Sequence, residues 1–163
     1  GHALVRIREG SRPLLNCPIR YAIVRKYRSV GIGIEWSLVR SDAWDAKAAR
    51  VDVRMFLAAE ALAGSDLEGA EMIVGELVAN VILHAPGPIG IYASWSGETA
   101  VLIVSDRGHG IPKVRLCPDA DAESGRGLLI VEALARSVEV FTVPFQGSRV
   151  VVELPVQRRL PAA

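Results

Sequence analysis

The stretch Glu76-Leu-Val-Ala-Asn80-Val-Ile-Leu-His84 places three polar side chains in an otherwise apolar segment. Glu76, Asn80 and His84 are spaced by four residues, so in a helix they form one stripe, each rotated by about 40° from the last. An asparagine inside a helix is unfavourable, because its amide competes with the backbone for hydrogen bonds. The stripe therefore predicts a helix with a functional polar face, although a solvent-facing edge would also explain Glu76.

The residue types of this stripe suit phosphoryl chemistry. The amide oxygen of Asn80 is a hard ligand of the kind that Mg²⁺ prefers when it bridges substrate phosphates. A carboxylate one turn earlier, at Glu76, is placed where it could take a proton from a hydroxyl nucleophile. His84 has a simpler explanation, because an imidazolium at a helix C-terminus interacts favourably with the helix dipole.

Two helices precede the first proline-rich turn. The helix around Asn80 follows an N-cap at Ser65 or Asp66 and ends before Pro86, which cannot continue the hydrogen-bond ladder. An earlier helix at 43–63 follows an N-cap at Ser41 or Asp42 and stops at Gly64. Apolar residues at steps of three and four predict its core face, made of Val51, Met55, Phe56, Ala59 and Leu62.

Strand signals surround the helices. The strands are expected at 35–39, 89–96, 99–105, 138–143 and 149–154, with a third helix at 128–135. Strands come in pairs joined by short turns, and helices lie between the pairs. The order β-α-α-β-β-α-β-β predicts an α+β two-layer sandwich, in which one mixed, mostly antiparallel sheet carries helices on one face.

A glycine-containing turn follows the strand at 99–105. It reads Asp106-Arg-Gly108-His-Gly110-Ile111-Pro112 and opens a loop at 106–124 that is longer than most connections. A carboxylate at a strand end can accept a hydrogen bond from the amino group of adenine, and glycines let the backbone approach the base. The dinucleotide fingerprint is excluded, because no helix follows the glycines at once. A plain turn at Asp106 is the alternative.

The loop ends at a second pair of glycines, in Ser124-Gly125-Arg126-Gly127-Leu128. Backbone N–H groups at a helix N-terminus bind phosphate, helped by the helix dipole. Arg126 adds a positive charge to such a site, and residues 113–124 could close over it as a lid. A glycine N-cap on a helix packed by Leu128 is the alternative.

Composition describes a globular chain with a basic beginning. Half of the 163 residues are apolar and the net charge is +1, which excludes a disordered chain and gives no general basic field for nucleic acid or a membrane surface. Residues 1–34 nevertheless carry a net charge of +6 and are interpreted as a basic arm before a domain at 35–163. Two distant cysteines and no secretion signal predict a cytoplasmic location.

Taken in this order, the segments 76–84, 106–110 and 125–127 resemble the N box and the two glycine boxes of the Bergerat-fold (GHKL) ATP-binding superfamily, which includes histidine-kinase catalytic domains, gyrase and MutL. Within it, Gly75-Glu-Leu-Val-Ala-Asn80 and Ser124-Gly-Arg-Gly-Leu-Leu-Ile-Val131 are most similar to RsbW/SpoIIAB-type anti-sigma-factor serine kinases. The resemblance covers about residues 35–155.

The resemblance implies a cofactor, roles and partners. Mg²⁺ would bind Asn80, Glu76 would be the general base and Asp106 would recognise the adenine of ATP. The remaining nucleotide contacts would come from Gly108, Gly110, Ile111, Gly125, Arg126, Gly127, Leu128 and Ser148. The family phosphorylates a serine of an anti-anti-sigma (STAS) protein, sequesters a sigma factor in the alternative complex and is usually a homodimer.

One departure and two alternatives stay open. The last box of the family has threonines after its glycine, whereas this chain has Gly147-Ser148-Arg149, so Ser148 could supply the hydroxyl while Arg149 puts the adenine contact in doubt. The first alternative is a non-catalytic module that acts only by binding its partner. The second is a detached histidine-kinase ATPase domain, although no pair of phosphoacceptor helices precedes residue 35.

Overall fold

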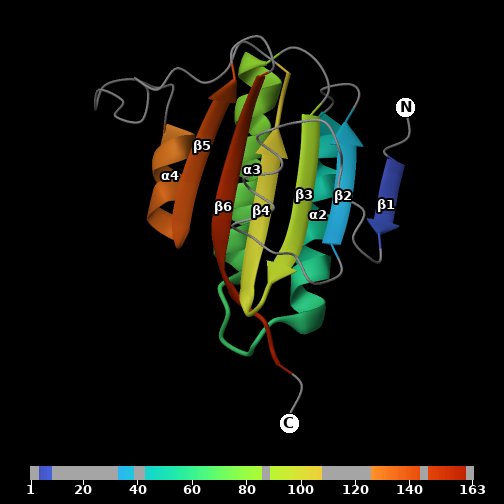
Figure 1. Ribbon diagram of the computed structural model, residues 1–163, viewed down its shortest axis with the longest axis vertical. Helices are drawn as coiled ribbons and strands as arrows, with labels where there is room; N and C mark the ends of the chain where they lie inside the picture. The colour runs from blue at the N-terminus through green and yellow to red at the C-terminus, as the bar shows by residue number, and fades with distance from the viewer. Residues whose placement is uncertain are drawn as a thin grey trace.

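The computed structural model describes residues 4–8, 33–38, 43–85, 89–107, 126–143 and 147–160. With the labels of Figure 1, the elements are β1 (Leu4–Arg8), β2 (Gly33–Leu38), α2 (Ala43–Glu60), α3 (Leu67–His84), β3 (Ile89–Ser96), β4 (Thr99–Ser105), α4 (Arg126–Leu134), β5 (Ser137–Val143) and β6 (Gly147–Gln157). The predicted order of elements after residue 34 is confirmed.

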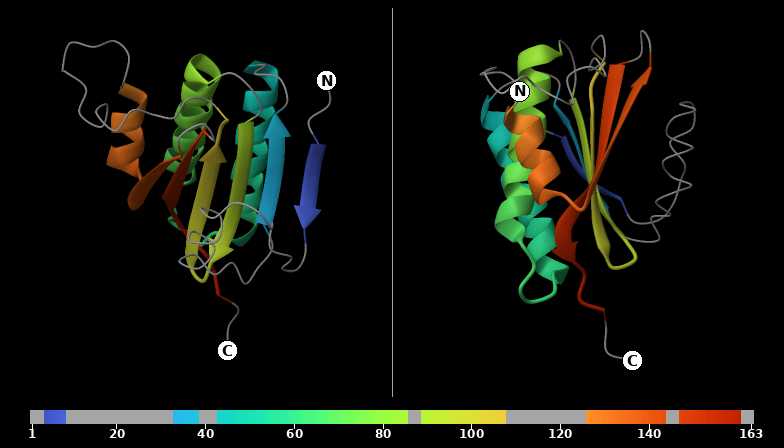
Figure 2. Two further views of the ribbon diagram at one scale, coloured as in Figure 1. Left: turned by 45° about the horizontal axis from the view of Figure 1, so that its top comes forward. Right: turned by 90° about the vertical axis from the view of Figure 1, so that its left-hand side faces the viewer.

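The strands form one six-stranded sheet in the order β1-β2-β3-β4-β6-β5. All three helices of the described chain lie on one face of it (Figure 2). The predicted α+β two-layer sandwich is therefore confirmed. The sheet is antiparallel at each described pairing rather than mixed, because β6 enters between β4 and β5, the two strands that α4 connects.

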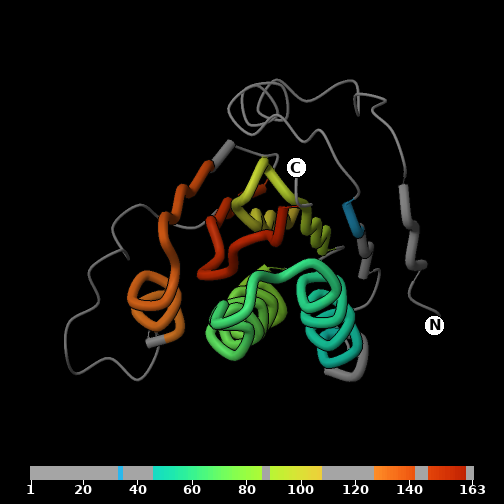
Figure 3. The backbone as a smooth tube through the Cα atoms, turned by 90° about the horizontal axis from the view of Figure 1, so that it is seen from below, coloured from blue at the N-terminus to red at the C-terminus, as the bar shows by residue number. Residues whose placement is uncertain are grey.

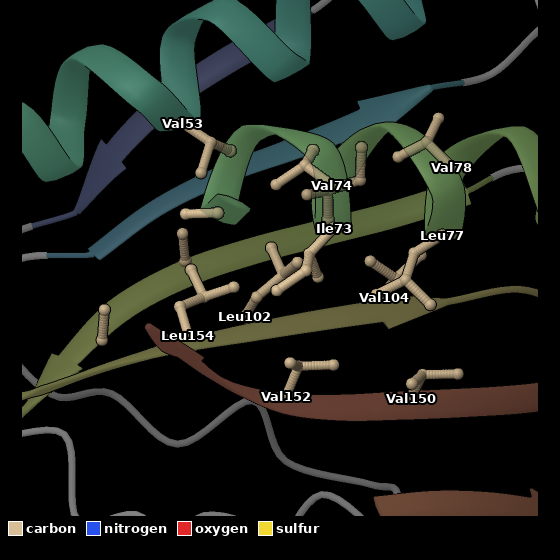
Figure 4. Close-up of a cluster of buried hydrophobic side chains, with 14 of the residues drawn as sticks. Val53, Ile73, Val74, Leu77, Val78, Leu102, Val104, Val150, Val152 and Leu154 are labelled. Atoms are coloured by element: carbon tan, nitrogen blue, oxygen red, sulfur yellow. The ribbon is translucent and has the colours of Figure 1, made fainter. Parts of the chain in front are cut away.

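The hydrophobic core lies between the sheet and the helices. Alternate residues of each strand point to the helical side, so that Ile91, Leu102 and Val152 are completely buried. The cluster in Figure 4 includes Val53, Ile73, Val74, Leu77, Val78, Leu102, Val104, Val150, Val152 and Leu154. Burial of each such side chain stabilises the fold by about 1.5–3 kcal/mol. The core thus fixes α3 against the centre of the sheet.

Helix α3 begins at an N-cap that the sequence predicts. The Asp66 side chain accepts a hydrogen bond of 2.8 Å from the backbone N–H of Gly69. At the other end, the N–H of Ala85 donates to the carbonyl oxygen of Val81 over 2.8 Å. The preceding helix was predicted to reach residue 63, but α2 ends at Glu60, because Ala61 forms an isolated β-bridge with Arg158 instead of a further helical turn. Gly64 lies in the connection between α2 and α3 with a φ of +86°.

The predicted core face of α2 is wrong except at Phe56, which packs against Trp95 with ring centroids 6.3 Å apart. The buried residues of α2 are Ala49, Val53 and Leu57, whereas Val51, Met55, Ala59 and Leu62 are exposed. Apolar residues occur on all sides of this alanine-rich helix, so periodicity alone selects no face. Contact with the sheet selects the stripe that faces it.

Part of the predicted basic arm belongs to the sheet. Residues 4–8 form β1 and pair with β2, with Arg8 opposite Gly33 and Leu4 opposite Ser37. These residues of the segment interpreted as a basic arm therefore form the edge strand of the sheet, where pairing with a neighbouring strand overrides a weak local pattern. Residues 9–32 lie outside the described part of the chain, as do the predicted caps Ser41 and Asp42.

The C-terminal end of β6 is fastened to the connection between α2 and α3. The N–H of Leu62 donates to the carbonyl oxygen of Gln157 over 2.7 Å, and the N–H of Arg159 donates to that of Glu60 over 2.7 Å. The Arg158 guanidinium pairs with the Glu60 carboxylate at 2.5 Å and lies 5.9 Å from the centroid of the Trp95 ring. These contacts close the lower end of the sandwich in Figure 1.

Candidate functional site

A buried carboxylate lies where β4 ends beside the start of β6. Asp106 is 8% exposed and Ser148 is 4% exposed. The Ser148 hydroxyl donates to the Asp106 carboxylate, and the backbone N–H of Asp106 donates to the carbonyl oxygen of Ser148 over 3.0 Å. One hydrogen bond thus reaches the carboxylate itself and the other holds the backbone of Asp106, so the residue is fixed beside Ser148 on the helical side of the sheet.

Gly147 brings β6 close to Asp106 in a way that only glycine permits. Its φ is +97°, and a Cβ atom there would clash with the carbonyl oxygen of Asp106 and lie 2.7 Å from the Cα of Arg107. Gly147 was predicted as the glycine of the family's last box, but with no role in the site. The structure adds its close approach to the backbone of Asp106.

The helical side of the site combines α3 with the first turn of α4. Glu76 and Asn80 are half-buried on α3. A Cβ atom at Gly127 would lie 2.5 Å from Oε2 of Glu76, so the carboxylate packs against the backbone of α4 at its N-terminal end. Two motifs that are far apart in the sequence, those of Glu76 and Gly127, are therefore in contact.

Four element ends meet at the end of the sandwich that holds the buried carboxylate. The C-terminal ends of α3 and β4 and the N-terminal ends of α4 and β6 point to the upper half of Figure 1. Ser148 faces the helices, because it alternates with Arg149 and shares the helical side with the buried Val150. The buried carboxylate thus lies at this end of the sandwich, and the stripe of Glu76 and Asn80 belongs to the C-terminal half of α3, which leads toward it.

Several other predicted residues have a different place. Arg149 belongs to the face of the sheet away from the helices, opposite Ser105 and Phe141 in register. Arg149 therefore does not share the helical side with Ser148, since side chains of adjacent strand residues point to opposite faces. The effect of Arg149 on adenine binding stays a prediction. His84 is exposed at the end of α3, in agreement with its simpler explanation.

Part of the predicted site lies outside the described residues. Gly108, Gly110, Ile111 and Gly125 belong to this part, together with the lid predicted at 113–124. Arg126 is described as the first residue of α4. Leu128 is half-buried and packs against the hydrophobic core, so at least part of its role is structural.

The sequence of this chain matches a known protein family over the residues that form the site. Residues 39–152 match the model of a family described as histidine kinase-like ATPase domain, and this range includes every described residue of the site. The chain belongs to the histidine kinase-like ATPase domain family. It is therefore a GHKL-type ATP-binding domain, as the resemblance of its motifs predicts at the level of the superfamily.

Two solved structures are similar to this ATPase domain, each with 22% sequence identity. Full-length ShkA in complex with AMPPNP matches with a TM-score of 0.48, over 59% of this chain and 23% of that chain. The histidine kinase domain of a blue-light activated histidine kinase from Erythrobacter litoralis EL346 matches with a TM-score of 0.43, over 55% and 44%. The matched region covers less than half of the length of each of these two solved chains. No curated protein shows significant similarity.

The family match supports ATP as the ligand of this domain. Gly147 and Gly127 each lie against another part of the chain, one against the backbone of Asp106 and one against the Glu76 side chain, and the nucleotide contacts of the site residues stay predictions. Mg²⁺ at Asn80 stays a prediction; within the described residues, no group of three or more His, Cys, Asp and Glu could hold a metal ion. None of the helices in the described part could span a membrane, and the cytoplasmic location stays a prediction.

Proposed function

We propose that this ATPase domain is a protein serine kinase that phosphorylates a STAS-type anti-anti-sigma protein and, in an alternative complex, sequesters a sigma factor. The proposal rests on the resemblance to RsbW/SpoIIAB-type kinases in the segments 75–80 and 124–131. The observation that supports a catalytic role is the packing of the Glu76 carboxylate against Gly127. In this proposal, Glu76 is the base beside the helix N-terminus that would hold the phosphates.

Each described residue then has a chemical task. When bound with Mg²⁺, ATP supplies the phosphoryl group. Asp106, oriented by Ser148, accepts a hydrogen bond from the adenine amino group, and this contact selects the base. Backbone N–H groups in the first turn of α4, around Gly127, bind the phosphates. The amide oxygen of Asn80 holds Mg²⁺.

Glu76 acts in the step that defines a serine kinase, the removal of the proton from the serine hydroxyl. A serine hydroxyl must lose its proton as its oxygen attacks phosphorus, and a carboxylate within hydrogen-bond reach accepts that proton. Glu76 lies one helical turn before Asn80 and against Gly127, so the base, the metal ligand and the phosphate site adjoin one another. Binding alone would not require a carboxylate at this position.

Replacement of Glu76 by Gln tests the kinase. We expect Glu76→Gln to bind Mg·ATP as the wild type does in calorimetry and to lose phosphotransfer about 10²-fold or more, because the amide cannot accept the serine proton. The readout is transfer of labelled phosphate from ATP to STAS-domain proteins from the same organism. Phosphoserine is distinguished from phosphohistidine by its stability in acid.

Glu68→Gln is the matched control, because Glu68 is an exposed glutamate in the first turn of the same helix and lies outside the site. It should leave both binding and transfer unchanged. Equal transfer by the wild type and Glu76→Gln would contradict the assignment of the base. ATP binding without transfer to any STAS protein would favour the non-catalytic module, and acid-labile label would favour a histidine-kinase ATPase domain.

A further inference from the structure

Two valines are buried on the face of the sheet that points away from the helices. Figure 3 shows α2, α3 and α4 together on the other side of the strands. Val101 of β4 and Val151 of β6 nevertheless form a second apolar cluster, separate from the core beneath the helices, with Ile103 and Phe141 packed against it. Val101 and Val151 are each only 1% exposed. On an open sheet face a valine stays partly in contact with water, because its strand neighbours flank it and do not lie above it.

The sequence of the central strands also indicates burial on both faces. Ala100-Val-Leu-Ile-Val104 in β4 and Val150-Val-Val152 in β6 are unbroken apolar runs, whereas a strand with one wet face alternates apolar and polar residues. Ser94 of β3, opposite Val101 in register, is 4% exposed as well. Since the structure contains a single chain, the residues that cover this face belong to that chain.

The connection between β1 and β2 begins and ends beside this cluster. Arg8 pairs with Gly33, which places the two ends of residues 9–32 together. The same row of the sheet continues from Gly33 through Ser94 to Val101. Neighbouring strands are about 4.8 Å apart, so Val101 lies about 10 Å from these ends. A hairpin needs a connection of only about 2–5 residues, which leaves most of residues 9–32 for another task.

The other long connection outside the described residues is less well placed. Residues 108–125 follow the end of β4 and lead to Arg126, the first residue of α4, in the helical layer. Asp106, close to the start of this connection, is about 17 Å from Val101 along the direction of β4. The connection at 9–32 is therefore the segment that fits the position of the cluster.

The composition of residues 9–32 suits contact with an apolar face. Leu14-Leu15 and Tyr21-Ala-Ile-Val24 supply apolar side chains, and basic residues are interspersed with them, at Arg12, Arg20, Arg25, Lys26 and Arg28. The apolar side chains can pack on the sheet while the long basic side chains extend to water. The family match begins at residue 39, so this segment lies outside the matched region.

From these observations we propose that residues 9–32 pack across the outer face of the sheet, over Val101 and Val151, as a third layer of the molecule. This layer closes the outer face to other proteins, so a protein partner of the ATPase domain binds at another surface. The proposal is independent of the kinase reaction, because Asp106 and Ser148 lie on the helical side of the sheet.

Alkylation of a cysteine at residue 101 tests this layer in the full chain. In a background of Cys17→Ser and Cys117→Ser, Val101→Cys should react with iodoacetamide about 10-fold or more slowly than Glu98→Cys, because burial protects its thiol. Glu98→Cys is the matched control, since Glu98 is exposed in the turn before the same strand.

Substitutions within the segment show whether it provides the protection. The combination of Tyr21→Ser, Ile23→Ser and Val24→Ser should raise the alkylation rate of Val101→Cys about 10-fold or more and leave that of Glu98→Cys unchanged. Circular dichroism checks that each variant is folded. Equal rates at residues 101 and 98 without the serine substitutions, or a rate at residue 101 that they leave unchanged in a folded protein, would overturn the proposal.

A spin label gives a second measurement that leaves the apolar residues of the segment intact. Attached to the native Cys17 in a Cys117→Ser chain, the label should broaden the amide signals of Val101 and Val151 and leave that of Met55, which is exposed on α2, sharp. Unchanged signals at Val101 and Val151 would overturn the proposal. So would broadening in isotope-labelled chains that are mixed with separate spin-labelled chains, because a second copy would then supply the contact.

Discussion

At the scale of residues, the site depends on backbone contacts as much as on side chains. The Asp106 carboxylate is buried, and burial of a charge is costly unless hydrogen bonds compensate for it. Ser148 provides such a bond from its hydroxyl and accepts another through its backbone. This reciprocal pair requires β6 to start very close to the end of β4, which the glycine at 147 permits.

Gly147→Ala should therefore destabilise the protein more than substitution of another glycine with positive φ. We expect a loss of about 3 kcal/mol or more in the free energy of unfolding, because the methyl group adds a clash with the backbone of Asp106 to the cost of the left-handed conformation. Gly97→Ala is the control, since Gly97 has a φ of +63° and no atom lies within 4 Å of the place that its Cβ would take. It should cost about 1–2 kcal/mol.

Urea denaturation of both variants measures the difference. Equal losses in the free energy of unfolding for Gly147→Ala and Gly97→Ala would contradict the prediction that a clash with Asp106 adds to the cost at residue 147. The same proteins should differ in nucleotide affinity, with Gly147→Ala weakened by displacement of the Asp106 carboxylate and Gly97→Ala unchanged in calorimetry.

Residue types predicted the chemistry of the site better than its geometry. Asp106 at a strand end and Glu76 on a polar stripe follow from local patterns, and the structure describes both on the same side of the sheet. The contact of Glu76 with Gly127 depends on how α3 and α4 pack, which the motif order only implies. The position of Arg149 depends on strand register, because a shift of one residue moves a side chain to the other face.

At the scale of elements, strong local signals gave correct results and weak ones did not. The cap at Asp66 is local and was predicted. The end of α2 was predicted three residues too late, because long-range hydrogen bonds to the end of β6 replace the last predicted helical residues. The core face of α2 was not predicted, because apolar residues on every side of a helix are compatible with several different core faces. The strand β1 was missed because its evidence is the long-range pairing with β2.

The cap of α3 provides a quantitative test at this scale. Asp66→Ala should lower the free energy of unfolding by about 1 kcal/mol, because the N–H of Gly69 loses its acceptor. Asp66→Asn should be nearly neutral, since the amide oxygen can still accept that hydrogen bond. Thermal unfolding followed by circular dichroism distinguishes the two. A loss of the same size in Asp66→Asn would mean that charge, and not the hydrogen bond, stabilises this end of the helix.

At the scale of the whole molecule, nucleotide binding should stabilise the fold. A ligand that binds the native state contributes about 2.7 kcal/mol at a concentration one hundred times its dissociation constant. For a chain of this size, that raises Tm by roughly 5–10 °C. Mg·ATP should have this effect on the wild type and much less on Asn80→Ala, as measured by differential scanning calorimetry. Equal shifts would remove Asn80 from the nucleotide site.

The position of β6 has a consequence for synthesis of the protein. This strand is the last of the sheet to leave the ribosome, yet it lies between β4 and β5 and its far end is bonded to the connection between α2 and α3. Until residue 157 has emerged, the nascent chain has two unpaired strand edges and an incomplete core, both prone to aggregation. The earlier elements thus cannot complete the sheet and core until β6 has been synthesised. Chaperones that bind exposed strands would act during that interval.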